Sequence, residues 1–74
     1  MTNVADVIRR YPQILGGTPV FKGTRVPVRI LIEFLSAGDS LERFLDSYPS
    51  VSREQAVAVL ELAGNLLLNG ASAA

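Results

Sequence analysis

The stretch Ala56–Leu68 constrains this chain most, because it is almost wholly apolar and Glu61 is its only charged residue. It is too short to cross a bilayer. A helix on the surface of a small domain normally carries one apolar stripe and a polar remainder, whereas here apolar positions surround most of the helix. We expect one face to pack on the chain's own core and another to bind a partner. The alternative is a helix wrapped on all sides by its own domain. The residues that we assign to a dimer or toxin interface are Val59, Leu62 and Leu66.

The length of the chain limits how much of the apolar surface of such a helix the rest of the chain can bury. Seventy-four residues make one small domain, and folding at this size hides only roughly 60–65% of the surface of the extended chain. Apolar residues make up 49% of the sequence and charged residues 19%, a balance that excludes a disordered charged tail. We expect one domain over 1–74, with an N-terminal extension and β-ribbon over 1–26 and a three-helix bundle over 27–70.

Several classes of protein are excluded by residue counts alone. The sequence has no cysteine, which removes disulfide scaffolds and thiolate metal sites. It also has no histidine, the commonest general base and metal ligand. No basic stretch followed by an apolar core opens the chain. We therefore expect a cytoplasmic protein that is not an enzyme, with no catalytic residue, no metal and no cofactor.

The first third of the sequence predicts short extended pieces. Residues 1–12 are ambiguous, because Thr2 or Asn3 could cap a short helix while the same apolar positions could begin a strand. The next pieces are a turn at residues 16–17, a strand at residues 20–21, and a tight turn at residues 22–24 into a second extended piece. Pro19 and Pro27 lack amide donors, so these strands must be short or lie at an edge.

Three helices follow the ribbon. The first begins at Pro27 and ends at Gly38, and its apolar residues recur at the helical spacing. A second begins after the capping residue Ser40 and ends before Pro49. In the third, Ser52 and Gln55 form a capping box, and we expect the helix to run from about residue 53 to residue 68, where Asn69-Gly70 ends it. A helix-turn-helix module requires such an arrangement, although any three-helix bundle has short loops.

Three segments together resemble a known family, the domain of unknown function numbered 433. They are GGTPVFKGTRVPV at residues 16–28, AGDS at residues 37–40 and YPSVSREQ at residues 48–55. The resemblance covers roughly residues 8–66. It implies a mainly α fold, in which an N-terminal β-ribbon is followed by a homeodomain-like three-helix helix-turn-helix bundle. It also implies a protein similar to the VapB-type antitoxins.

Basic residues concentrate in the first part of the chain. Residues 1–29 hold five basic residues and one acidic residue, whereas residues 30–74 hold two basic and six acidic residues. This split is compatible with two partners of opposite charge preference, or with accidental unevenness on a solvated surface. Lys22, Arg25 and Arg29 lie close in sequence and could follow a phosphate backbone. Arg25 could instead tie the ribbon to the bundle by bonding Glu33 or the carbonyl at a helix end.

The start of the third helix is the other candidate DNA-binding segment. In a helix-turn-helix protein the first turn of the second motif helix meets the base edges. Carried over to this sequence, that assigns DNA binding to Ser52, Arg53 and Gln55. The capping box explains Ser52 and Gln55 without DNA, and a nearby acidic residue, Glu54, would be repelled by phosphate.

Two functions of different classes follow from these observations. The first, implied by the resemblance, is the antitoxin of a type II, VapBC-like toxin–antitoxin pair. Such a protein neutralises a PIN-like ribonuclease toxin and binds operator DNA as a dimeric transcription repressor of its own operon. The second is a protein-interaction or dimerisation module without DNA binding. The zero net charge of the chain and its acidic third helix favour the second function.

Overall fold

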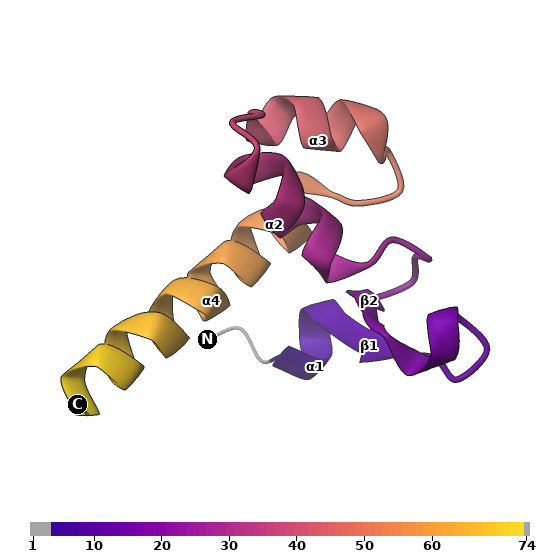
Figure 1. The fold of residues 1–74 in the computed structure, drawn as a ribbon. Coiled ribbons are helices and arrows are strands. Elements are labelled where there is room, and N and C mark those ends of the chain that lie inside the picture. The colour runs from indigo at the N-terminus through magenta and orange to yellow at the C-terminus, as the bar shows by residue number, and fades with distance from the viewer. Residues whose placement is uncertain (1–3, 74) are drawn as a thin grey trace.

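The computed structural model describes residues 4–73 and is mainly helical, with a small antiparallel ribbon near the N-terminus (Figure 1). The fold class predicted from the sequence, a β-ribbon followed by three helices, is confirmed. The two cap candidates Thr2 and Asn3 lie outside the described residues. The elements, in chain order, are α1 (Val4–Val7), β1 (Ile8–Arg10), the 3-10 turn η1 (Leu15–Gly17), β2 (Pro19–Phe21), α2 (Val28–Ser36), α3 (Leu41–Ser47) and α4 (Arg53–Ala73).

The ambiguous N-terminal segment forms both of the expected structures, a short helix and then a strand. Strand β1 pairs with β2 in antiparallel register, with Ile8 opposite Phe21. The piece after the 22–24 turn also lies beside β2, where an isolated antiparallel bridge joins Val20 to Pro27 and the Phe21 N–H donates to the Val26 carbonyl at 3.0 Å. The ladder cannot extend there, because Pro27 has no N–H and the Val26 N–H donates to Thr24 Oγ1 at 3.1 Å.

Helix α2 ends at Ser36 with Ala37 as its C-cap, and Gly38, the stop that the sequence predicts, follows directly. This glycine has φ of 92°, a left-handed conformation that disfavours side chains. The Gly38 N–H donates to the Leu35 carbonyl at 3.1 Å, and the Asp39 N–H donates to the Phe34 carbonyl at 2.9 Å. These two bonds satisfy carbonyls at the end of the helix in a Schellman arrangement.

A Gly38→Ala substitution should lower the free energy of unfolding by about 1–2 kcal/mol, the cost of a left-handed alanine. A Cβ at this position would meet no atom within 4 Å, so the cost is confined to the backbone. The matched control is Gly64→Ala within α4, where a Cβ also meets nothing and the backbone φ is not positive. That control should raise stability by up to about 1 kcal/mol. Urea denaturation followed by circular dichroism measures both, and equal effects would contradict the assignment of Gly38.

Both predicted caps of α3 and α4 are confirmed. Ser40 Oγ accepts from the Arg43 N–H at 3.1 Å. Ser52 Oγ accepts from the Gln55 N–H, and Gln55 Oε1 accepts from the Ser52 N–H, both at 3.1 Å. The predicted end of α4 near residue 68 is wrong, since the helix continues to residue 73. Gly70 does not adopt the left-handed conformation that ends α2, so the helical backbone runs through it.

The core lies between the ribbon, α2, α3 and the first half of α4. Phe21, Leu31 and Phe44 are fully buried at its centre. The Phe44 ring contacts three other aromatic rings, with centroid separations of 5.9 Å to Phe21, 5.7 Å to Phe34 and 5.3 Å to Tyr48. Helix α2 packs on α3 and β2, and α1 packs on α4.

Helix α4 is much longer than the body on which it packs. Its 21 residues span about 31 Å at 1.5 Å per residue, close to the longest extent of the molecule, 36 Å. Figure 1 shows its C-terminal half extending away from the other helices. The side chains of this half are therefore covered by few other parts of the same chain.

Candidate interaction surfaces

The C-terminal half of α4 exposes three consecutive leucines, which we call the leucine end. The exposed fractions are 73% for Leu66, 72% for Leu67 and 69% for Leu68. The three residues predicted for the interface differ in burial: Val59 belongs to the core, Leu62 is half-buried and Leu66 is exposed. The sequence analysis did not assign Leu67 and Leu68 to the interface. Both follow the residues of the same helix that pack on the core, and this position could have indicated that they are exposed.

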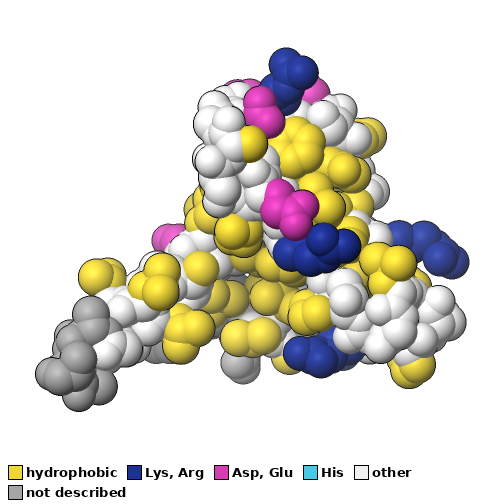
Figure 2. All heavy atoms as spheres, viewed as in Figure 1, with side chains coloured by type: hydrophobic (Ala, Val, Ile, Leu, Met, Phe, Trp, Pro, Cys, Tyr) yellow, Lys and Arg dark blue, Asp and Glu magenta, His cyan; other side chains and the backbone are white. Residues whose placement is uncertain are grey.

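An apolar groove of about 410 Å³ runs beside the leucine end, and we call it the α4 groove. Residues from α1, β1, α2 and α4 line it, and none of them is charged or polar. They are Val4, Ile8, Val28, Ile32, Val59, Leu62, Ala63 and Leu66. Figure 2 shows hydrophobic side chains gathered along α4 and the adjoining part of the body. Exposed apolar surface that is this continuous marks an interaction site in a soluble protein.

The first turn of α4 carries Ser52, Arg53 and Gln55, the residues predicted to meet DNA bases. The structure engages all three in contacts within the chain. Arg53 Nη2 lies 2.6 Å from Glu42 Oε2, and Ser52 and Gln55 cap the helix. In addition, Gln55 Nε2 donates to the Lys22 carbonyl at 3.0 Å, a bond between segments 33 residues apart. Ser52 and Arg53 are nevertheless exposed, and Gln55 is half-buried.

The hydrogen bond and charge of Glu42 raise the pKa of Arg53, and Glu54 acts in the same direction. A raised pKa means that the folded state holds the proton more tightly, so this pair stabilises the fold below the ordinary pKa of arginine and is lost only as the pH rises through the folded value. Both side chains are more than half exposed, where solvent screens such a pair. We therefore expect no change in stability from Arg53 between pH 5 and 9.

The cations of the ribbon are arranged differently. Arg29 forms an ion pair with Glu33 at 3.2 Å on the exposed side of α2. The sequence analysis named Glu33 as one of two possible partners of Arg25, but Glu33 pairs with Arg29 instead. Lys22 and Arg25 are exposed and make no ion pair within residues 4–73. The sequence reasoning gave no role to Arg9 and Arg10, two further exposed cations on β1.

The turn over residues 22–25 is held rigidly from inside. Thr24 is buried, and its Oγ1 donates to the Phe21 carbonyl at 2.8 Å while accepting from the Val26 N–H. The Gly23 N–H donates to Tyr11 Oη at 3.2 Å. Gly23 has φ of 77°, which explains the glycine at this point of the turn.

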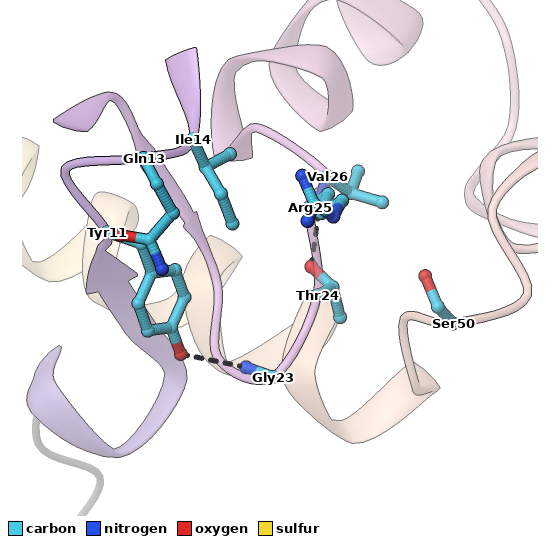
Figure 3. Close-up of a pocket in the computed structure, with 8 residues that line it drawn as sticks. All are labelled: Tyr11, Gln13, Ile14, Gly23, Thr24, Arg25, Val26 and Ser50. Carbon is cyan, nitrogen blue, oxygen red and sulfur yellow. Dashed lines mark hydrogen bonds between the residues drawn. The ribbon is translucent and has the colours of Figure 1, made fainter. Parts of the chain in front are cut away.

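An open hollow of about 560 Å³ lies beside this turn (Figure 3), and we call it the turn hollow. Tyr11, Gln13 and Ile14 lie on one side of it, the turn itself forms the middle, and Ser50 from the loop between α3 and α4 lies on the other side. The sequence reasoning assigned no binding role to Tyr11, Gln13 or Ser50. The sequence hardly indicates that these residues line one hollow, because Ser50 is far from the other two in sequence and the three share no local pattern.

Among residues 4–73, no three acidic, histidine or cysteine side chains come together in a way that could hold a metal ion. No helix over these residues is long and apolar enough to span a membrane.

One known protein family matches most of the chain. The family described as protein of unknown function, DUF433, matches residues 8–63. The chain belongs to the DUF433 family. The match covers the ribbon, α2, α3 and the first half of α4, and the leucine end lies beyond it.

This DUF433 chain is also similar to an uncharacterized protein and to a solved structure. An uncharacterized protein of Sinorhizobium fredii (strain NBRC 101917 / NGR234), y4eO, is 46% identical over 50 residues, which are 68% of this chain. The chain spans about a quarter of that relative, 23% of its length. The crystal structure of a DUF433 member from Anabaena variabilis ATCC 29413 has a TM-score of 0.70 at 24% identity, covering 84% of this chain and 61% of that one. At this identity the similarity shows the fold alone.

Proposed function

We propose that this DUF433 protein is a homodimeric protein-binding module of the antitoxin type, which pairs through α4 and neutralises a PIN-like ribonuclease toxin in the cytoplasm. One observation carries the proposal, namely the exposed leucine end beside the uncharged α4 groove. Removing a leucine side chain from water stabilises a complex by about 1.5–3 kcal/mol. The antitoxin role itself rests on the resemblance of the ribbon and helix motifs to VapB-type antitoxins.

A second copy of the chain is the occupant that best fits the α4 groove. The chain has zero net charge, so two copies meet without overall repulsion. A two-fold axis brings the same patch of both copies together, so that the leucine end of each copy covers the groove of the other. The segment of α4 after Glu61 has no charged residue, which matches a groove lined only by apolar side chains.

Light scattering on the purified chain tests the dimer, and ribonuclease inhibition tests the toxin. We expect a mass twice the 7.9 kDa of one chain, falling toward one chain on dilution. Co-expression with the product of the neighbouring gene should yield a stable complex, and that complex should lack the ribonuclease activity of a PIN-like partner. If the chain is a dimer but the ribonuclease stays active, the result would support an interaction module and contradict the antitoxin role. A monomer at all concentrations would contradict the pairing through α4.

Operator binding is a second candidate function, favoured by the exposed cations of the ribbon. Lys22 and Arg25 make no ion pair within the described part of the chain, and Arg9 and Arg10 are exposed on β1. We infer that any DNA contact is made by these cations to phosphates, because Arg53 and Gln55 are engaged elsewhere. Such a dimer would repress its own promoter.

Reversing the charge of Lys22 and Arg25 together should abolish this binding. We expect Lys22→Glu with Arg25→Glu to weaken retention of the promoter duplex by at least about a hundredfold. Each lost phosphate contact should reduce the slope of log affinity against log salt by roughly 0.9. Fluorescence anisotropy between 50 and 200 mM salt measures both effects. Arg43→Glu, an exposed cation on α3, is the matched control, and an equal loss in that variant would show a general charge effect.

A further inference from the structure

The turn hollow gathers hydrogen-bond donors that have no acceptor within residues 4–73. Tyr11 Oη accepts the Gly23 N–H, so its own hydrogen remains available, because a phenol can accept and donate at once. The side chains of Gln13, Arg25 and Ser50 make no hydrogen bond to any described residue. None of the lining residues is acidic.

This donor set identifies the class of ligand. A guanidinium, two hydroxyls and a carboxamide around one hollow are complementary to an anion with several oxygens. A carboxylate offers two oxygens, whereas a phosphate group offers more acceptors spread around one centre. Arginine, serine, glutamine and tyrosine are also the side chains that contact phosphates in protein–DNA complexes, and the planar fork of arginine binds a phosphate in a bidentate manner.

The surroundings of the hollow favour a phosphate that is part of a nucleic-acid strand. Lys22 is exposed on the same turn, and the chain up to residue 29 carries five basic residues against one acidic residue. The hollow is open rather than enclosed, so it can admit a group that projects from a polymer. The apolar lining residues Ile14 and Val26 would face the adjacent sugar.

The turn is also built to hold its position before any ligand arrives. Thr24 anchors it to the core, Tyr11 fixes Gly23, and Gln55 fixes Lys22 through its carbonyl. A turn backbone that is already in place loses little entropy when a ligand binds beside it. We propose that the turn hollow is a phosphate site, in which Arg25, Ser50, Gln13 and Tyr11 bind one backbone phosphate of a nucleic-acid strand. This inference rests on the second candidate function, operator binding.

The test is a titration of the ¹⁵N-labelled full chain with a mixed-sequence DNA duplex at low salt, followed by amide chemical shifts. We expect the amides of Gly23, Arg25 and Ser50 to shift on addition of DNA. Inorganic phosphate should move the same amides at much higher concentration, and acetate at equal ionic strength should not.

Substitutions at two of the donor residues, Arg25 and Ser50, test their contributions individually. Arg25→Gln should weaken duplex binding about tenfold or more, the effect of losing a charge-assisted hydrogen bond. Ser50→Ala should weaken it a few-fold, and Arg25→Lys should restore only part of the loss because lysine lacks the fork. Arg43→Gln on α3 removes the same charge elsewhere and should change affinity by less than twofold.

The remaining outcomes separate this proposal from operator binding. Duplex binding that leaves these amides unmoved, or that tolerates both Arg25→Gln and Ser50→Ala, overturns the phosphate site and leaves operator binding standing. An absence of duplex binding by the dimer overturns both. Equal shifts with acetate overturn the phosphate assignment and point to an acidic protein segment in the hollow.

Discussion

We expect a Leu66→Asp variant to run as a monomer at concentrations where the proposed dimer of the parent chain forms. Leu66 is 73% exposed in one copy, so the substitution costs the folded monomer little. Between two copies the same carboxylate would be buried among the apolar residues of the α4 groove, and an unpaired buried charge costs several kcal/mol. We therefore expect the dimer dissociation constant to rise by at least about a hundredfold.

Light scattering and circular dichroism on the same samples decide this prediction. The control is Asn65→Asp, which places the same charge one residue earlier on another exposed face of α4. That variant should remain dimeric. A dimeric Leu66→Asp chain would exclude the α4 groove from the interface. Loss of helical signal in Leu66→Asp alone would instead place this leucine in the core of the single chain.

A Phe44→Ala variant is expected to be largely unfolded at room temperature. Phe44 is fully buried and contacts three aromatic rings. Truncating a buried phenylalanine costs about 3–5 kcal/mol through lost transfer energy and the cavity left behind. A single core in a chain this short supplies only about that much net stability. The one substitution therefore removes most of what holds the domain together.

Thermal and urea unfolding monitored by circular dichroism measure this loss. Tyr48→Phe is the matched control, because it keeps an aromatic ring in contact with Phe44 and removes only a hydroxyl. We expect that control to change the free energy of unfolding by about 0.5 kcal/mol or less. A cooperative transition near the parent temperature for Phe44→Ala would contradict the central place of this ring in the core.

The parts of the fold that could be predicted from the sequence are those set by neighbouring residues. The Ser40 cap, the capping box of Ser52 and Gln55, and the left-handed Gly38 each depend on residues a few positions apart. The end of α4 could not be predicted in this way. Glycine ends a helix only when the chain turns away there, and Gly70 keeps a helical backbone.

The candidate sites were harder to predict because they depend on distant segments. Tyr11 contacts Gly23 across 12 residues, and Gln55 contacts Lys22 across 33 residues. No local pattern indicates either bond, yet together they hold Gln55 against the ribbon and fix the turn backbone beside the turn hollow. The apolar excess of α4 was readable in the sequence, whereas the division between core and exposed surface along that helix required the neighbouring elements.

The side chain of Gln55 uses both ends of one rigid group. Its oxygen accepts the Ser52 N–H at the start of α4, and its nitrogen donates to the Lys22 carbonyl of the ribbon turn. A carboxamide is planar, so its oxygen and nitrogen cannot be reoriented independently. A force that displaces the turn must therefore tilt this plane and strain the hydrogen bond that caps the start of the long helix. Glutamate, with the same shape and no N–H, could keep the first contact but not the second, so the hydrogen bond between the ribbon turn and the helix depends on a single nitrogen atom.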